Sequence, residues 1–151
     1  QKLATRFGAS FVHSRENRFN NTGTPAPDNT QVRMSDGGLF FETGALAPGV
    51  TVIEANFDLL AVDLGFKYKG LALHTEFYYR TLSEFNTDGP VPINLPWEAG
   101  IGLNIYPSKT RSWRINVQAV HVYKSAAGGT FGLYTAGQTG TTFTIGTDIL
   151  L

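Results

Sequence analysis

The chain has 151 residues, of which 42% are hydrophobic and 13% aromatic, and this composition indicates one folded domain rather than a disordered chain. Because twelve basic residues balance twelve acidic ones, nothing in the overall charge favours nucleic acid as a partner. The absence of cysteine excludes disulfides, thiolate metal sites and cysteine nucleophiles.

The chain begins at Gln1 without a methionine or a signal peptide, so we expect a processed or trimmed product. It contains no run of the ~20 apolar residues that a membrane-spanning helix requires. If the protein crosses a membrane, it must therefore do so with β-strands, the other structure that satisfies every backbone polar group in lipid.

Apolar residues alternate with polar or small ones in six segments, each bounded by Gly, Pro, Asn or Asp. A period of two predicts β-strands with one apolar face. We therefore predict an all-β chain, with strands over residues 3–13, 50–69, 71–81, 97–106, 112–124 and 141–151.

The second predicted strand changes its apolar phase midway, because odd positions are apolar over residues 53–59 and even positions over residues 62–68. A β-bulge inserts one residue and would cause such a change, so we expect a bulge near Leu60. Lys69-Gly70 follows directly, and we expect a tight turn there.

The connections between the predicted strands alternate in length. Long connections cover residues 14–49, 82–96 and 125–140, whereas short turns cover residues 69–70 and 107–110. Outer-membrane barrels have short periplasmic turns and long outer loops. The pattern therefore predicts an antiparallel up-and-down transmembrane β-barrel in the bacterial outer membrane, with both ends of the chain on the periplasmic side.

The two faces of the predicted strands carry different side chains. Aromatic residues lie near strand ends on the apolar faces, where membrane-interface girdles occur; we expect Tyr68, Tyr79, Trp97, Trp113 and Tyr123 to anchor the interface. Charged residues and glycines lie on the opposite faces, as a water-filled lumen would accept. We expect Arg6, Lys67, Glu76, Arg80, Glu98 and Arg114 to line a pore. The same charges could instead pair across neighbouring strands and stabilise the sheet modestly, and the two roles are compatible.

Six tilted strands enclose too little space for a complete pore, because even a barrel filled by its own side chains needs ~8. We therefore interpret residues 1–151 as a single segment of a larger barrel. Its other strands lie upstream in the same protein or come from other copies or chains, and we favour the first arrangement.

Five segments resemble the phosphate-selective porin family, often called the porin O and P type. Residues 43–52 (TGALAPGVTV), 61–70 (AVDLGFKYKG) and 76–80 (EFYYR) carry the resemblance in the first half of the chain. Residues 97–107 (WEAGIGLNIYP) and 134–140 (YTAGQTG) look like the final strands and the last outer loop of that family.

The resemblance implies the C-terminal part of a porin that lets small anionic or neutral solutes diffuse passively, with phosphate among the candidate anions. It also implies a homotrimer embedded in outer-membrane lipid. The terminal residues 146–151 (GTDILL) are similar to the assembly signal of outer-membrane proteins.

Nothing in the sequence indicates catalysis, so we expect neither an enzyme nor a cofactor. The histidines His13, His74 and His121 fall on different predicted strands without metal-ligand spacing, so we predict no metal site. No serine lies in a GxSxG motif, and no carboxylate pair has an evident acid and base arrangement.

Two other classes of protein remain open. A soluble β-sandwich or jelly-roll binding module also has alternating strands, but it packs its apolar faces together in a dry core. A structural or adhesive surface protein would use the long Asn, Thr and Gly loops as its contact region. The side on which the apolar residues lie separates these classes, because in a membrane barrel they point away from the centre.

Overall fold

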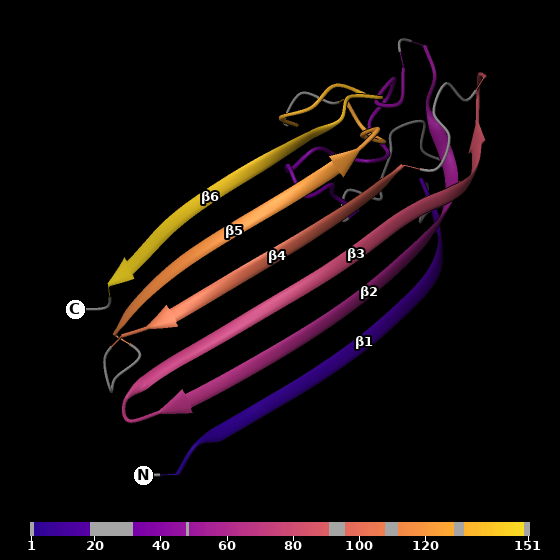
Figure 1. The fold of residues 1–151 in the computed structure, drawn as a ribbon. Coiled ribbons are helices and arrows are strands. Elements are labelled where there is room, and N and C mark those ends of the chain that lie inside the picture. Colours follow the sequence, from indigo (N-terminus) through magenta and orange to yellow (C-terminus); the bar gives the residue numbers. More distant parts are fainter. Residues whose placement is uncertain are drawn as a thin grey trace.

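The computed structural model describes residues 2–18, 32–47, 49–90, 96–107, 112–128 and 132–149. Its six strands form one sheet in chain order, and each strand is antiparallel to the next (Figure 1). The strands are β1 (Ala4–Asn17), β2 (Val52–Tyr68), β3 (Leu71–Thr87), β4 (Trp97–Tyr106), β5 (Trp113–Tyr123) and β6 (Gly140–Ile149). The prediction of an all-β, antiparallel, up-and-down sheet is confirmed. The sheet is open, with β1 and β6 at its edges.

The short turns and the two ends of the chain lie at one end of the sheet, and the long connections lie at the other (Figure 1). Lys69 and Gly70 form the predicted tight turn with φ angles of 48° and 93°. Positive φ at both positions is the geometry that suits a two-residue hairpin to the twist of its strands. Residues 108–110 of the second predicted turn lie outside the described residues.

Two strands continue beyond their predicted ends. β1 reaches Asn17 and β3 reaches Thr87, so the predicted loops 14–49 and 82–96 begin too early. The extensions escaped prediction because their outward residues are polar, whereas the prediction followed apolar alternation. Backbone pairing with β2 forms these parts regardless of the side chains, and an ion pair of 3.0 Å between Arg15 Nη2 and Glu54 Oε2 joins β1 to β2.

The bulge predicted near Leu60 is wrong. The pairing of β2 with β3 continues without a shift from Asn56 to Tyr68, and the register shifts lie between Val52 and Asn56 instead. The apolar phase changes because different partners bury the two faces of β2. Near the long connections, Ala55 and Phe57 pack beneath a loop, whereas farther along the apolar side chains lie on the opposite face.

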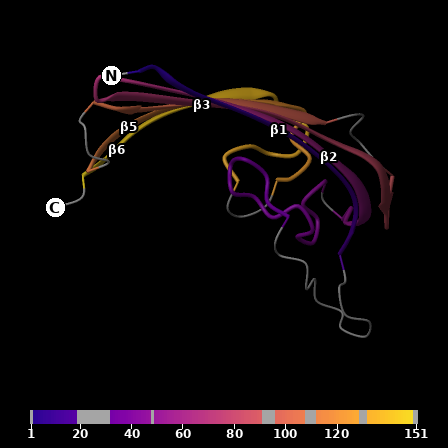
Figure 2. The ribbon, with the colours of Figure 1, turned by 90° about the horizontal axis from the view of Figure 1, so that it is seen from below.

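The sheet is curved like an arch, and the loops fold beneath it on the concave side (Figure 2). Residues 32–47, here called the inner segment, form a core there with β2, β3 and the start of the β5–β6 connection. The buried apolar residues of this core are Met34, Phe40, Phe41, Ala45, Leu46, Val50, Val52, Ala55, Leu82, Ala126 and Ala127. The core therefore lies between the concave face and its own loops.

Among the residues that the structure describes, no helix has the length and apolar character needed to cross a membrane.

Candidate functional site

The strand register separates a polar face from an apolar face across the middle of the sheet. One row of paired residues on the concave face is Gly8, Asp63, Glu76, Gly102, Gln118 and Thr144. The adjacent row on the convex face is Ala9, Val62, Phe77, Ile101, Ala119 and Phe143. Neighbouring side chains of a strand point to opposite faces. The polar row is therefore on the side that also receives the loops.

All six residues predicted to line a pore lie on the concave face. Arg6, Lys67, Glu76 and Arg114 are exposed there. Arg80 and Glu98 are instead buried beneath the inner segment, where the whole residues are 9% and 1% exposed. The alternation along β3 and β4 predicted the face of Arg80 and Glu98 correctly, but it did not indicate the segment that covers them.

Most of the concave charges pair across strands, as the alternative interpretation of these residues expected. Arg6 Nε lies 3.2 Å from Asp63 Oδ1, and Arg114 Nε donates to Asp148 Oδ2 at 2.7 Å. A third pair joins Arg80 to Glu98. The positive and negative charges of these side chains therefore largely offset one another along the concave face.

An open hollow of about 360 Å³ lies beside the pair of Arg6 and Asp63. Gly8, which also lines the hollow, leaves room for the Asp63 carboxylate, because a Cβ built at Gly8 would lie 1.9 Å from Asp63 Oδ2. His74 lies between two carboxylates, with Nε2 at 3.4 Å from Asp63 Oδ1 and Nδ1 at 3.5 Å from Glu76 Oε1. The hollow thus exposes both signs of charge to a solute on the concave side.

The five predicted interface aromatics lie on the convex face. Trp97 packs against Tyr79 and Tyr123, with ring centroids 5.7 Å and 5.6 Å apart. This group lies toward the long connections, whereas Tyr68 and Trp113 lie toward the short turns. The two groups therefore border the apolar part of the convex face at both ends.

The contacts that the loops make with the concave face and with one another were not predicted from the sequence. Ser35 contacts Glu98, and Asp36 accepts a hydrogen bond from the backbone N–H of Tyr134 at 3.1 Å. The signal that could have revealed an inward fold is the apolar run Leu39-Phe40-Phe41, which a loop surrounded by water would leave exposed at a cost in free energy.

No family model, curated protein or solved structure matches the chain. The likeness to phosphate-selective porins therefore remains a hypothesis based on the five segments quoted above.

The histidines lie on both faces of the sheet. His13 and His121 point to the convex face, and His74 points to the concave face. In the described ranges, no cluster of three or more His, Asp or Glu side chains is arranged to hold a metal ion.

Proposed function

We propose that this chain forms part of an outer-membrane β-barrel channel of the porin type, through which small solutes diffuse passively. The observation that carries the proposal is the orientation of the sheet, with polar residues on the concave face and bare apolar residues on the convex face. Phe7, Phe143 and Ile145 are 70%, 76% and 77% exposed. Burial of such side chains is worth ~1.5–3 kcal/mol each, so the convex face needs an apolar environment.

Lipid acyl chains fit that environment better than the second sheet of a soluble sandwich. The convex apolar residues of β3 run from Leu71 to Tyr79, which matches the ~9–11 residues of a tilted membrane-spanning strand. Aromatic residues border this band at both ends, as in outer-membrane barrels. A sandwich would also pack the apolar faces of two sheets against each other, whereas here the apolar convex face stays bare and the loops pack on the concave face.

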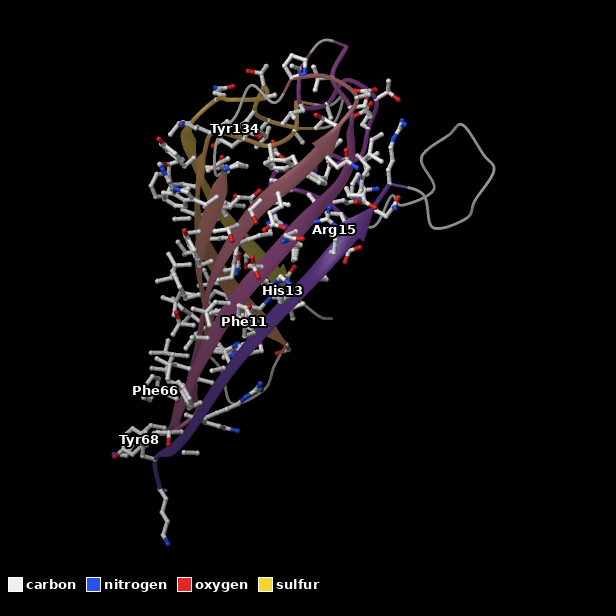
Figure 3. All side chains as sticks on the ribbon, turned by 90° about the vertical axis from the view of Figure 1, so that its right-hand side faces the viewer. Phe11, His13, Arg15, Phe66, Tyr68 and Tyr134 are labelled. Atoms are coloured by element: carbon white, nitrogen blue, oxygen red, sulfur yellow. The ribbon has the colours of Figure 1, made fainter. Side chains whose placement is uncertain are left out.

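The convex face turns polar where β1 leaves the apolar band. Phe11, His13 and Arg15 follow one another along this strand, and Phe66 and Tyr68 project near the opposite end (Figure 3). His13 Nδ1 lies 2.6 Å from Asp58 Oδ1. We assign this polar extension to the water and headgroup region outside the hydrocarbon core.

The open sheet requires further strands for a closed barrel. Six strands are fewer than the ~8 of the smallest filled barrels, and exposed strand edges attract pairing with other strands. We propose that β1 and β6 pair with strands upstream in the same protein, which then assembles as a trimer of barrels.

The charges of the concave face favour a broad class of small solutes. Because arginines pair with carboxylates on neighbouring strands, this part of the wall presents no excess of positive charge. We therefore propose weak selectivity among small neutral and charged solutes, with phosphate one anion within that class.

Planar-bilayer recordings of the purified full-length protein test this proposal. We expect stepwise, ohmic openings, with reversal potentials under a salt gradient that report weak ion selectivity. A monodisperse, water-soluble protein that never inserts into bilayers would contradict the proposal and favour a soluble binding module.

A further inference from the structure

The side chain of Glu98 holds the inner segment by binding the backbone of that segment. The carboxylate accepts hydrogen bonds from the backbone N–H of Ser35, at 3.2 Å to Oε2 and 3.4 Å to Oε1, and also from the Ser35 hydroxyl. Glu98 is on β4, and only 1% of the residue is exposed. A wall residue that is itself almost fully buried thus binds the backbone of the segment.

Arg80 on β3 binds the same stretch from the neighbouring strand. Its Nη2 lies 2.5 Å from Glu98 Oε2, and its Nη1 donates to the backbone carbonyl of Arg33 at 2.8 Å. The guanidinium also lies over the ring of Phe57, 5.5 Å from its centroid. Arg80 and Glu98 together therefore hold two backbone positions of the segment, at Arg33 and Ser35.

Attachment of the segment alone would not require buried charges. Phe40, Phe41 and Leu46 already bury the segment against the sheet, and apolar replacements of buried ion pairs are often neutral or stabilising. Arg80 Nε, moreover, is buried without a hydrogen-bond partner, which costs stability. Arg80 and Glu98 add a defined position, because hydrogen bonds are directional and fix the segment's backbone at a place that apolar packing alone leaves adjustable.

The inner segment is also connected to the edge strand β6. Asp36 Oδ2 accepts a hydrogen bond from the backbone N–H of Tyr134 at 3.1 Å, and Asp36 Oδ1 accepts one from Gly38. The Tyr134 hydroxyl lies 2.6 Å from Thr142 Oγ1 on β6. A chain of contacts therefore runs from β3 and β4, through the inner segment and the β5–β6 connection, to β6.

We propose that Arg80 and Glu98 are positioning residues that hold the inner segment across the lumen and thereby set the width of the channel. This inference rests on the proposed channel function. Loss of the pair releases residues 33–36 while the apolar core keeps the rest of the segment attached. The channel then becomes wider and its current noisier, and the Arg33–Met34 peptide bond becomes accessible to trypsin.

The central variant is Glu98→Gln, which keeps the size of the side chain but removes its charge. Ser35→Ala is a milder variant outside the strands, so it leaves the sheet intact if Glu98→Gln fails to fold. Asp148→Asn is the matched control, because Asp148 also pairs with an arginine on the concave face but is exposed and lies far from the segment. Retention of β-structure by circular dichroism verifies each variant.

Two measurements test separately whether the pair positions the segment and whether the segment sets the channel width. Trypsin cleavage after Arg33, followed by mass spectrometry in detergent micelles, reports the position of the segment without any channel activity. Single-channel conductance in planar bilayers reports the width of the lumen. For Glu98→Gln we expect cleavage to accelerate on the order of tenfold or more, because breaking a buried pair strongly favours local opening. We also expect a larger conductance for Glu98→Gln, whereas Asp148→Asn should leave the cleavage rate unchanged.

An unchanged cleavage rate in both Glu98→Gln and Ser35→Ala would overturn the positioning role. Faster cleavage with unchanged conductance in a protein that conducts would overturn the claim that the segment sets the channel width. Faster cleavage in a protein that never conducts would confirm the positioning of the segment and overturn the channel function on which the width depends.

Discussion

The ring of Tyr78 lies directly over Gly100 on the neighbouring strand, so that a Cβ built at Gly100 would fall 2.1 Å from Tyr78 Cε1. The two residues are register partners on β3 and β4. This position brings the Tyr78 hydroxyl to 2.5 Å from Ser35 Oγ. The missing side chain at Gly100 thus allows an aromatic ring of the wall to reach the inner segment.

We predict that Gly100→Ala destabilises the protein by ~1–3 kcal/mol, the usual cost of overpacking, because the ring must move and lose its contact with Ser35. Gly102→Ala is the matched control, since it is on the same strand and face with nothing within 4 Å of the added Cβ. Urea unfolding from lipid vesicles measures both. Equal stability of the two variants would contradict the close packing of Tyr78 on Gly100.

A charge on the convex face should be far more costly than the same charge on the concave face. We predict that Ile145→Arg lowers the free energy of unfolding in vesicles by ~2–4 kcal/mol, which is the cost of an arginine near the bilayer midplane. Thr144→Arg, one residue earlier on the same strand but facing the concave side, should cost much less. A similar loss for both variants, measured by urea titration, would argue against lipid on the convex face.

The balance of charges on the concave face should control ion selectivity. Asp63→Asn removes the partner of Arg6 and leaves a positive charge on the wall. We predict a shift of the reversal potential toward anions, with a permeability ratio raised by up to about fivefold, because an unpaired charge a few Å away in water is worth ~1 kcal/mol.

Asp58→Asn is the control for that measurement. Asp58 is on the same strand but pairs with His13 on the convex face, so its loss should leave the reversal potential unchanged. A shift of the same size in both variants would show that the potential responds to net charge rather than to the concave wall.

The sequence predicted the parts of the fold in which apolar and polar residues alternate. The alternation from Leu71 to Tyr79 indicated both the strand and the face of each residue, and Lys69-Gly70 indicated its turn. The six pore-lining and five interface residues consequently lie on the predicted faces, although their functions remain proposals.

The remaining features depend on contacts between distant residues, which alternation does not record. The polar end of β1, residues 14–17, pairs with β2 through its backbone and has no apolar pattern. The phase change along β2 suggested a bulge at Leu60, whereas its cause is the inner segment packing over Ala55. The contact of Glu98 with Ser35 joins residues 63 positions apart, a separation over which no local motif operates.

Single-cysteine scanning along β3 distinguishes a channel wall from a water-soluble sheet, and it is possible because the chain has no native cysteine. In membranes, we predict that cysteines at residues 72, 74 and 76 react with a water-soluble maleimide. Cysteines at residues 73, 75 and 77 should resist it, and a fluorophore attached there should be quenched by brominated lipid. Uniform reactivity along the strand, or quenching confined to the even positions, would contradict a channel wall with a wet concave face and a lipid-covered convex face.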